Sequence, residues 1–328
     1  MSGALWVFAE QREGVLQGVV LELLGRAREL ADLAGRPLEA LLLGEDVEPL
    51  AGELIRYGAD TVYLVEHRLL AHYTSDAYTA AVVALARAYR PEVFLLGHTA
   101  IGRDLAPRVA AELGTGLSAH VTGLEWDEKG LLRQVVPAFG GRGMCAILCP
   151  ERRPQMATVR PGVFPRPAPK GEREGRLVRV PVELDLQAIR TRFLGFVPEP
   201  APGRSLTEAE MVVAGGAGMG DREGWRLIER LAEVLGAAVG GTRPPLDAGW
   251  IGEGQMIGQS GVTIRPRLYI GVGISGEMQH TVGIRDAGVV VAINSDPQAR
   301  IFQEADFGIV GDARKVLPLL IQALGGTA

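Results

Sequence analysis

Short apolar runs alternate with helical patterns in two separate stretches of this 328-residue chain, and that alternation limits its fold most. In the first stretch the runs at 5–9, 38–43, 61–65 and 93–97 are predicted to be buried strands, because they are continuous instead of alternating with polar residues. Leucine, valine and alanine recur at helical spacing between them, over residues 15–34, 47–57 and 75–89. Such alternation implies a parallel sheet covered by helices.

After Gly114 the pattern changes, because strand-like runs follow one another with no helical pattern between them. They cover residues 119–126, 130–136, 144–149 and 155–160, with a turn signal at 127–130. We expect an antiparallel extension of the first domain here. A loop rich in proline, glycine and charges then leads to a last strand at 175–183.

The second alternation begins after the Pro-Glu-Pro-Ala-Pro-Gly stretch at 198–203, which is the predicted domain boundary. It divides the chain into a domain over 1–197 and a domain over 198–328. Strands are expected at 211–214, 237–240, 267–272, 288–294 and 306–310, and helices over 223–235, near 276–286, after Asp296-Pro297 and after Asp312. The predicted fold class is therefore α/β, with two Rossmann-like parallel-sheet domains, the first with an antiparallel extension.

Composition excludes several classes of protein. The net charge of -5 lacks the basic excess of a nucleic-acid-binding protein. No apolar run approaches the roughly 18 residues of a membrane span, so no membrane insertion is expected. The first residues carry no basic or Arg/Ser-rich leader pattern. The two cysteines, Cys145 and Cys149, lie in an apolar run and are predicted to pack in a core. A cytoplasmic location follows as an expectation.

Polar residues and glycines that could serve a ligand are concentrated where the strands of the second domain end. The run 215–220, Gly-Gly-Ala-Gly-Met-Gly, follows a strand and precedes a helix, so its amides could bind a phosphate. Its glycines follow neither the dinucleotide fingerprint nor the P-loop order. A plain tight turn explains the run equally well.

Three further clusters lie at predicted strand ends. Residues 240–245, Gly-Gly-Thr-Arg-Pro-Pro, place an arginine on a stiff loop, where it is either a ligand contact or a solvated side chain. Residues 258–261, Gly-Gln-Ser-Gly, form a turn with amide and hydroxyl groups, or an ordinary polar loop. Residues 271–280 leave a strand through three glycines and place Gln279 and His280 on the first turn of a helix, where the histidine either meets a ligand or packs.

Together these clusters resemble the alpha subunit of electron-transfer flavoprotein. The family signature reads here as Leu268-Tyr-Ile-Gly-Val-Gly-Ile-Ser-Gly-Glu-Met-Gln-His280, followed by Gly283 and by Val291-Ala-Ile-Asn294. The resemblance spans the whole second half. The N-terminal alternation with its tail is similar to the family's first domain, which is nucleotide-hydrolase-like and contacts the beta subunit.

The resemblance implies an FAD site in the second domain. It places Arg243 over the flavin ring system, the hydroxyl of Ser260 at flavin N5 and His280 at the O2 end. Because a reduced flavin carries negative charge around N1 and O2, Arg243 is expected to favour reduction more than a neutral hydrogen bond from Ser260 does. The implied cofactor-binding residues are Gly216, Thr242, Arg243, Ile257, Gln259, Ser260, Gly261, Ser275, Gly276, Gln279, His280, Asn294 and Asp312.

The chain departs from the family at one position of the glycine run. The family segment is Gly-Gly-Arg-Gly, whereas Ala217 stands here in place of the arginine. The departure removes a family phosphate partner. Arg222, five residues further on, is a candidate replacement.

The function implied by the resemblance is that of an electron carrier, and no residue set in the sequence suggests conversion of a separate substrate. There is no nucleophile elbow and no zinc-type spacing, so no catalytic residue and no metal are expected. The implied partners are a beta subunit that holds AMP and completes a heterodimer, acyl-CoA dehydrogenases of fatty acid beta-oxidation or similar donors, and a quinone oxidoreductase as acceptor. Two alternatives stay open: a flavoenzyme that transforms its own substrate, and an FAD- or nucleotide-binding regulatory module.

Overall fold

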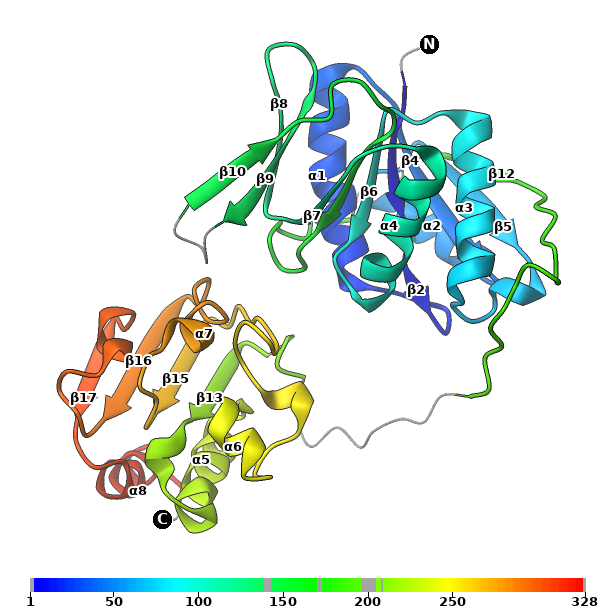
Figure 1. Ribbon diagram of the computed structural model, residues 1–328. Coiled ribbons are helices and arrows are strands. Elements are labelled where there is room, and N and C mark those ends of the chain that lie inside the picture. Colours follow the sequence, from blue (N-terminus) through cyan, green and yellow to red (C-terminus); the bar gives the residue numbers. More distant parts are fainter. Residues whose placement is uncertain are drawn as a thin grey trace. The chain divides into compact units, whose positions relative to one another are not determined.

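The protein is described by a computed structural model covering residues 3–138, 143–169, 171, 173–195, 205–207 and 209–326 (Figure 1). The chain divides into two compact units, Met1–Phe196 and Val197–Ala328. The predicted boundary between residues 197 and 198 lies outside the described residues. Both units are α/β with parallel sheets, which confirms the predicted fold class.

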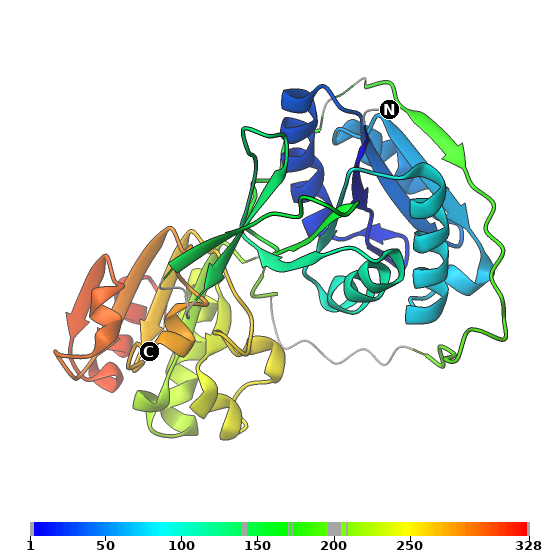
Figure 2. The same cartoon turned by 45° about the horizontal axis from the view of Figure 1, so that its top comes forward.

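The first unit is built on a seven-stranded sheet in the order β12-β5-β4-β1-β6-β11-β7, in which every pair of neighbours is parallel. Alternate residues of a strand enter separate cores, as Leu5 and Val7 pack on one face and Trp6 and Phe8 on the other. Burial on both faces explains the continuous apolar runs. The strands are β1 (Leu5–Phe8), β4 (Leu38–Gly44), β5 (Thr61–Glu66), β6 (Val93–Gly97), β7 (Leu117–Val121), β11 (Gln155–Val159) and β12 (Arg176–Arg179), the last at the edge of the sheet (Figure 2).

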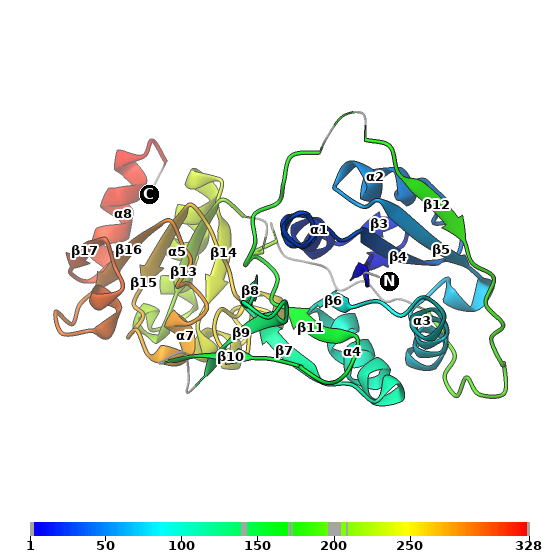
Figure 3. The ribbon, with the colours of Figure 1, turned by 90° about the horizontal axis from the view of Figure 1, so that it is seen from above.

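Helices cover both faces of this sheet, with α1 and α2 on one side and α3 and α4 on the other (Figure 3). Their bounds are α1 (Gly18–Ala34), α2 (Ala51–Arg56), α3 (Ser75–Tyr89) and α4 (Ala100–Leu113), with single 3-10 turns η1 (Glu48–Leu50) and η2 (Arg68–Leu70).

Three local features of these helices differ from the sequence-based expectation. Helix α1 begins three residues later than predicted, because β2 (Gln11–Arg12) and β3 (Val15–Leu16) form a small hairpin before it. Helix α4 was not predicted. A serine at the start of the predicted helix 75–89 favours an N-cap at that position, but Thr74 is the N-cap and the Ser75 hydroxyl bonds instead to Asp104.

The antiparallel extension is smaller than predicted. It consists of the sheet β10-β9-β8, formed by β8 (Gly123–Trp126), β9 (Leu132–Ala138) and β10 (Gly143–Ile147). The runs at 119–126 and 155–160 were expected to belong to it, but the first splits into β7 of the main sheet and β8, and β11 lies parallel between β6 and β7 in the main sheet. The antiparallel strands therefore act as the crossover between β7 and β11, a role that a helix usually performs.

The second unit has a five-stranded parallel sheet in the order β14-β13-β15-β16-β17. Helices α5 and α8 pack on one face, whereas loop side chains such as Ile257, Ile264 and Ile284 cover the other. The elements are β13 (Met211–Gly215), η4 (Ala217–Met219), α5 (Arg222–Leu235), β14 (Ala238–Gly241), α6 (Arg243–Asp247), η5 (Glu253–Gln255), β15 (Leu268–Val272), α7 (Met278–Thr281), β16 (Val289–Asn294), η6 (Arg300–Gln303), β17 (Phe307–Val310) and α8 (Ala313–Ala323).

Two predicted helices of this unit are much shorter than expected. The helix near 276–286 is the single turn α7, and the helix after Asp296-Pro297 is the 3-10 turn η6. Both segments lie on the loop-covered face, where glycines pack directly against other backbone: a Cβ at Gly283 would lie 2.7 Å from the nitrogen of Gly258. Close backbone approach of this kind leaves no room for a continuous helix.

The order of the strands in this unit favours ligand binding at the carboxyl edge of the sheet. The chain runs from β13 to β14 on one side and then returns to β15 on the other, so the strand order reverses at β13. Ligands of open parallel sheets bind outside the carboxyl ends of the strands at such a reversal. Within the described part of the chain, no helix has the length and apolar character needed to cross a membrane.

Candidate functional site

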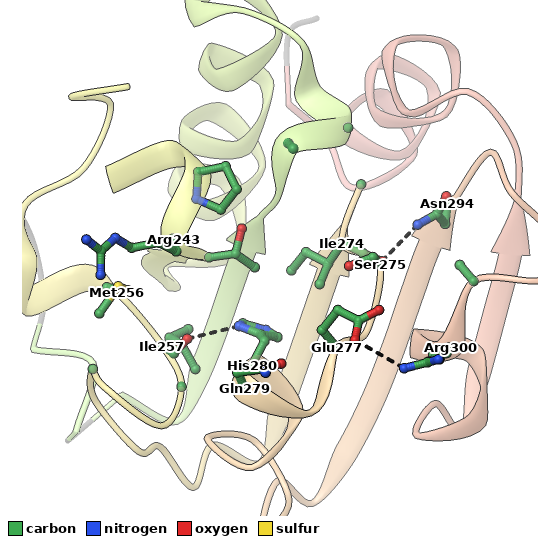
Figure 4. Close-up of a pocket in the computed structure, with 18 of the residues that line it drawn as sticks. Arg243, Met256, Ile257, Ile274, Ser275, Glu277, Gln279, His280, Asn294 and Arg300 are labelled. Carbon is green, nitrogen blue, oxygen red and sulfur yellow. Dashed lines mark hydrogen bonds and ion pairs between the residues drawn. The ribbon is translucent and has the colours of Figure 1, made fainter. Parts of the chain in front are cut away.

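A cavity of about 730 Å³ opens at the carboxyl edge of the second sheet (Figure 4). Its volume lies in the usual range for small-molecule sites, about 300–1,000 Å³. The loops after β13, β14, β15 and β16 line it together with residues 256–261. Ten predicted cofactor-binding residues are among those that line it: Thr242, Arg243, Ile257, Gln259, Ser260, Gly261, Ser275, Gln279, His280 and Asn294.

The other three predicted residues are not among those that line the cavity. A Cβ at Gly216 would lie 2.3 Å from the carbonyl oxygen of Gly273, so this glycine allows two loops to touch. Gly276, at φ +85°, faces the backbone of Ile301 in the same way. Asp312 is the N-cap of α8, since its Oδ1 accepts the N–H of Arg314 at 2.9 Å.

The glycine run 215–220 is a turn and not an open phosphate loop. The amide of Gly216 donates to Val272 at 2.9 Å, and the amide of Gly218 donates to Gly273 at 3.0 Å. The next two amides bond within the run itself. Because these donors are already used, the structure favours the tight-turn interpretation over phosphate binding by the amides.

His280 is buried, with 6% of its surface exposed, and both of its ring nitrogens have protein partners. Nδ1 lies 3.0 Å from the carbonyl oxygen of Ile257 and Nε2 lies 2.7 Å from the hydroxyl of Tyr269. A carbonyl can only accept, so Nδ1 carries the proton and Nε2 accepts from the tyrosine. Burial lowers the pKa of His280 to about 4, which keeps the ring neutral at pH 7. His280 therefore connects β15 to the loop at Ile257.

The turn 258–261 and helix α7 form one structural unit. The amide of Gln259 donates to the carbonyl of Gln279 at 2.7 Å. Gly258 has φ +141°, and a Cβ there would lie 2.3 Å from the same carbonyl oxygen. This glycine is consequently required both by its backbone conformation and by the close approach. Gln259 and Ser260 are exposed at the rim of the cavity.

Arg243 marks the β14 side of the cavity, beside Met256 (Figure 4). It begins the short helix α6, whose N-cap residue is Thr242 and whose next residue is Pro244. Its Nε donates to Asp247 at 2.8 Å, and this bond raises the pKa of Arg243. The guanidinium therefore carries a permanent positive charge at this end of the cavity.

The β16 side of the cavity contains polar residues that the sequence did not single out as ligand contacts. Arg300 and Glu277 form an ion pair at 3.1 Å there. The predicted residue Asn294 joins the loops on this side, because its Nδ2 donates to the carbonyl of Ile274 at 2.8 Å and its Oδ1 accepts the amide of Asp296 at 2.9 Å. In the sequence, Asp296-Pro297 was interpreted only as the start of a helix, so this segment was not considered as a ligand contact. The lining residues outside the prediction are Ala217, Gly218, Pro244, Met256, Gly258, Gly273, Ile274, Glu277, Asp296, Gln298, Ala299 and Arg300.

Arg222, the candidate replacement for the missing arginine, is not among the cavity-lining residues. Its Nη1 donates to the carbonyl of Trp250 at 2.9 Å, and its Nη2 pairs with Glu229 at 3.1 Å. The structure therefore does not support Arg222 as the replacement for the missing arginine.

The comparisons with known proteins agree with this architecture. Residues 5–185 match the family model described as electron transfer flavoprotein domain, and residues 205–285 match the electron transfer flavoprotein FAD-binding domain. The electron transfer flavoprotein subunit alpha of Thermoanaerobacterium thermosaccharolyticum is 49% identical, covering 98% of this chain and 97% of its own. Protein FixB of Clostridium saccharobutylicum is 47% identical, covering 97% and 95%. The alpha subunit from Clostridium acetobutylicum is 42% identical, again covering 97% and 95%.

Proposed function

Since this chain belongs to the electron transfer flavoprotein alpha-subunit family, we propose that its C-terminal unit binds FAD in the cavity at the carboxyl edge of the sheet. The family consists of electron carriers and not of enzymes that convert a substrate of their own. One observation carries the proposal: the cavity lies at the strand-order reversal, inside the unit that matches an FAD-binding domain, and gathers ten residues that the family resemblance points to.

The residues at the cavity fit a dinucleotide of this kind. Met256, Ile257 and Ile274 supply apolar surface for a ring system, and charged side chains lie at both ends. Gly258 allows the backbone of the turn to approach closely. When bound, FAD supplies the ability to take up and release electrons, which the amino acids of this chain lack.

The chain's own residues would bind and orient the cofactor. Arg243 provides a fixed charge at the ring end, and Gln259 and Ser260 provide polar groups at the rim. Asn294, one of the residues that the resemblance implies for cofactor binding, would hold the adenosine end. His280 has a positioning role, because its bonds to Ile257 and Tyr269 hold the loop at Ile257 against β15 and so keep this wall of the cavity in place. Gly216, Gly276 and Asp312 contribute by holding the surrounding loops.

The proposal includes partners that go with the family. An electron transfer flavoprotein beta subunit, holding AMP, completes a heterodimer in the cytoplasm and contacts the N-terminal unit. Exposed apolar side chains on and directly after β10, the edge strand of the antiparallel sheet, support such a contact, namely Met144, Ile147 and Leu148. Donors are acyl-CoA dehydrogenases of fatty acid beta-oxidation or similar flavoproteins, and the acceptor is a quinone oxidoreductase.

Co-expression with the beta subunit tests this proposal. The purified pair is expected to be yellow, to release FAD on denaturation and to be reduced by a dehydrogenase with its substrate. A colourless pair without recoverable flavin would overturn it. Direct reduction by a small metabolite would identify a substrate-transforming flavoenzyme, and bound flavin without an accessible redox couple would identify a regulatory module.

Replacing Arg243 by glutamine is expected to lower the reduction potential of bound FAD at least twice as far as Ser260→Ala does. Ser260→Ala removes one neutral hydrogen bond, worth about 1 kcal/mol, or about 40 mV for one electron. Arg243→Gln removes a full charge, although its exposure to solvent screens that charge. A redox titration of the co-expressed pair measures both shifts, with Arg243→Lys as the charge-conserving control. Equal shifts would contradict the ranking.

A further inference from the structure

We propose that Arg300 supplies the positive charge that binds the diphosphate of FAD, in place of the arginine that the glycine run lacks at Ala217. The inference rests on the proposed function and assigns a residue to one part of the cofactor. Arg300 lines the cavity together with Ala217 and Glu277, although it lies more than 80 residues from the glycine run in the sequence.

The glycine run itself offers little to an anion. The amide of Gly216 already donates to the last residue of β15, the amide of Gly218 donates to Gly273 directly after it, and the side chain of Ala217 has no charge. The first turn of α5 is also closed, because Asp221 accepts the N–H of Gly224 at 2.8 Å and pairs with Arg314 at 2.6 Å. Neither Asp221 nor Arg314 is among the residues that line the cavity. A dinucleotide in this cavity must therefore find its counter-charge elsewhere.

The backbone of Arg300 is held firmly beside the loop after β15. Its neighbour Ile301 is fully buried, and the amide of Ile301 donates to the carbonyl of Ser275 at 3.2 Å. A Cβ at Gly276 would lie 2.1 Å from the nitrogen of Ile301, so the two segments touch through backbone. This contact leaves only the side chain of Arg300 free to adjust to a ligand.

The ion pair with Glu277 directs the guanidinium across the cavity without saturating it. Arg300 Nη1 lies 3.1 Å from Glu277 Oε2, and in Figure 4 the two side chains point toward each other. The two side chains are 65% and 58% exposed, and exposed pairs of this kind contribute little to stability. A guanidinium has five N–H donors, so it can bind phosphate oxygens while it keeps this contact.

Without Arg300, the β16 side of the cavity would repel a diphosphate. The charged residues lining that side are Glu277, Asp296 and Arg300. Two carboxylates alone would oppose a dianion, and neither has another cationic lining residue beside it, since the second arginine that lines the cavity, Arg243, follows β14.

The separation of the two arginines suits one extended dinucleotide. Three inter-strand steps of about 4.8 Å separate β14 from β16, which places the two loops on the order of 14 Å apart. Arg243 then lies at the ring end of FAD and Arg300 lies beyond the ribityl chain, where the diphosphate begins.

The test uses the co-expressed pair with its beta subunit after removal of flavin. Flavin fluorescence gives Kd for FAD and for riboflavin, which has the ring system but no phosphate. Arg300→Gln is expected to raise Kd for FAD about tenfold or more, to leave Kd for riboflavin unchanged and to reduce the slope of log Kd against log salt concentration. Arg222→Gln is the matched control, because it removes an arginine that pairs with Glu229 outside the cavity.

Three results would contradict the assignment to the diphosphate. An unchanged Kd for FAD in Arg300→Gln would remove Arg300 from the site, while FAD binding by the wild-type pair left the proposed function intact. An equal loss for FAD and riboflavin would indicate general damage to the cavity. An unaltered salt dependence would show that no charge contact with the cofactor is lost. Failure of the wild-type pair to bind FAD would instead overturn the proposed function itself.

Discussion

Gly258→Ala is expected to abolish retention of FAD by the purified pair and to destabilise the C-terminal unit by on the order of 2–3 kcal/mol. Gly258 has φ +141°, and an added Cβ would lie 2.3 Å from the carbonyl oxygen of Gln279. That carbonyl accepts the amide of Gln259, so the turn and α7 would have to separate. Residues on both segments line the cavity, and their separation would remove one of its walls.

Gly254→Ala is the matched control for this prediction. Gly254 lies four residues earlier, without a positive φ, and an added Cβ there meets no atom within 4 Å. We expect this variant to keep its flavin and its stability. Flavin content after gel filtration and the urea midpoint measure both effects. Full flavin content in Gly258→Ala would show that the close contact between the turn and α7 is not needed for the site.

Lowering the pH from 7 to 4 is expected to reduce the stability of the C-terminal unit by on the order of 3 kcal/mol through His280 alone. The folded pKa is about 4, whereas an unperturbed histidine titrates near 6.5. Between these values the unfolded chain binds more protons than the folded chain. Stability from this group is therefore complete above about pH 6.5 and is lost as the pH falls toward 4.

His280→Gln isolates this contribution, because glutamine does not titrate. The variant is expected to be less stable at pH 7, since it disturbs the bonds to Ile257 and Tyr269, but its stability should depend less on pH. The measurement is urea unfolding of the flavin-free pair at pH 7 and pH 4.5, followed by hydrogen exchange in peptides from β15. Equal pH dependence in the variant and the wild type would contradict a buried neutral His280.

The strands were predictable because their burial is a local property of the sequence. Residues 93–97 were predicted as a strand and form β6 with the same bounds, and α3 matches residues 75–89 in the same way. Strand direction was not local. The run at 155–160 was expected in the antiparallel extension but joins the main sheet parallel to β6. Its partner strands lie more than 30 residues away in the chain, so the local pattern contains no information about its direction.

The amino-acid sequence by itself determined the fold class, the family and most of the residues that gather at the cavity, because parallel strands bring their carboxyl ends to one edge. Only the tertiary structure decided which polar atoms there remain free. The amide of Gly216 is used by Val272, and the nitrogens of His280 are used by Ile257 and Tyr269. These partners lie from 11 to 56 residues away in the chain, so the spacing within a motif carries no information about them. Contacts between residues distant in the chain likewise decide that Arg300 lines the cavity and that Arg222 bonds to Trp250 outside it.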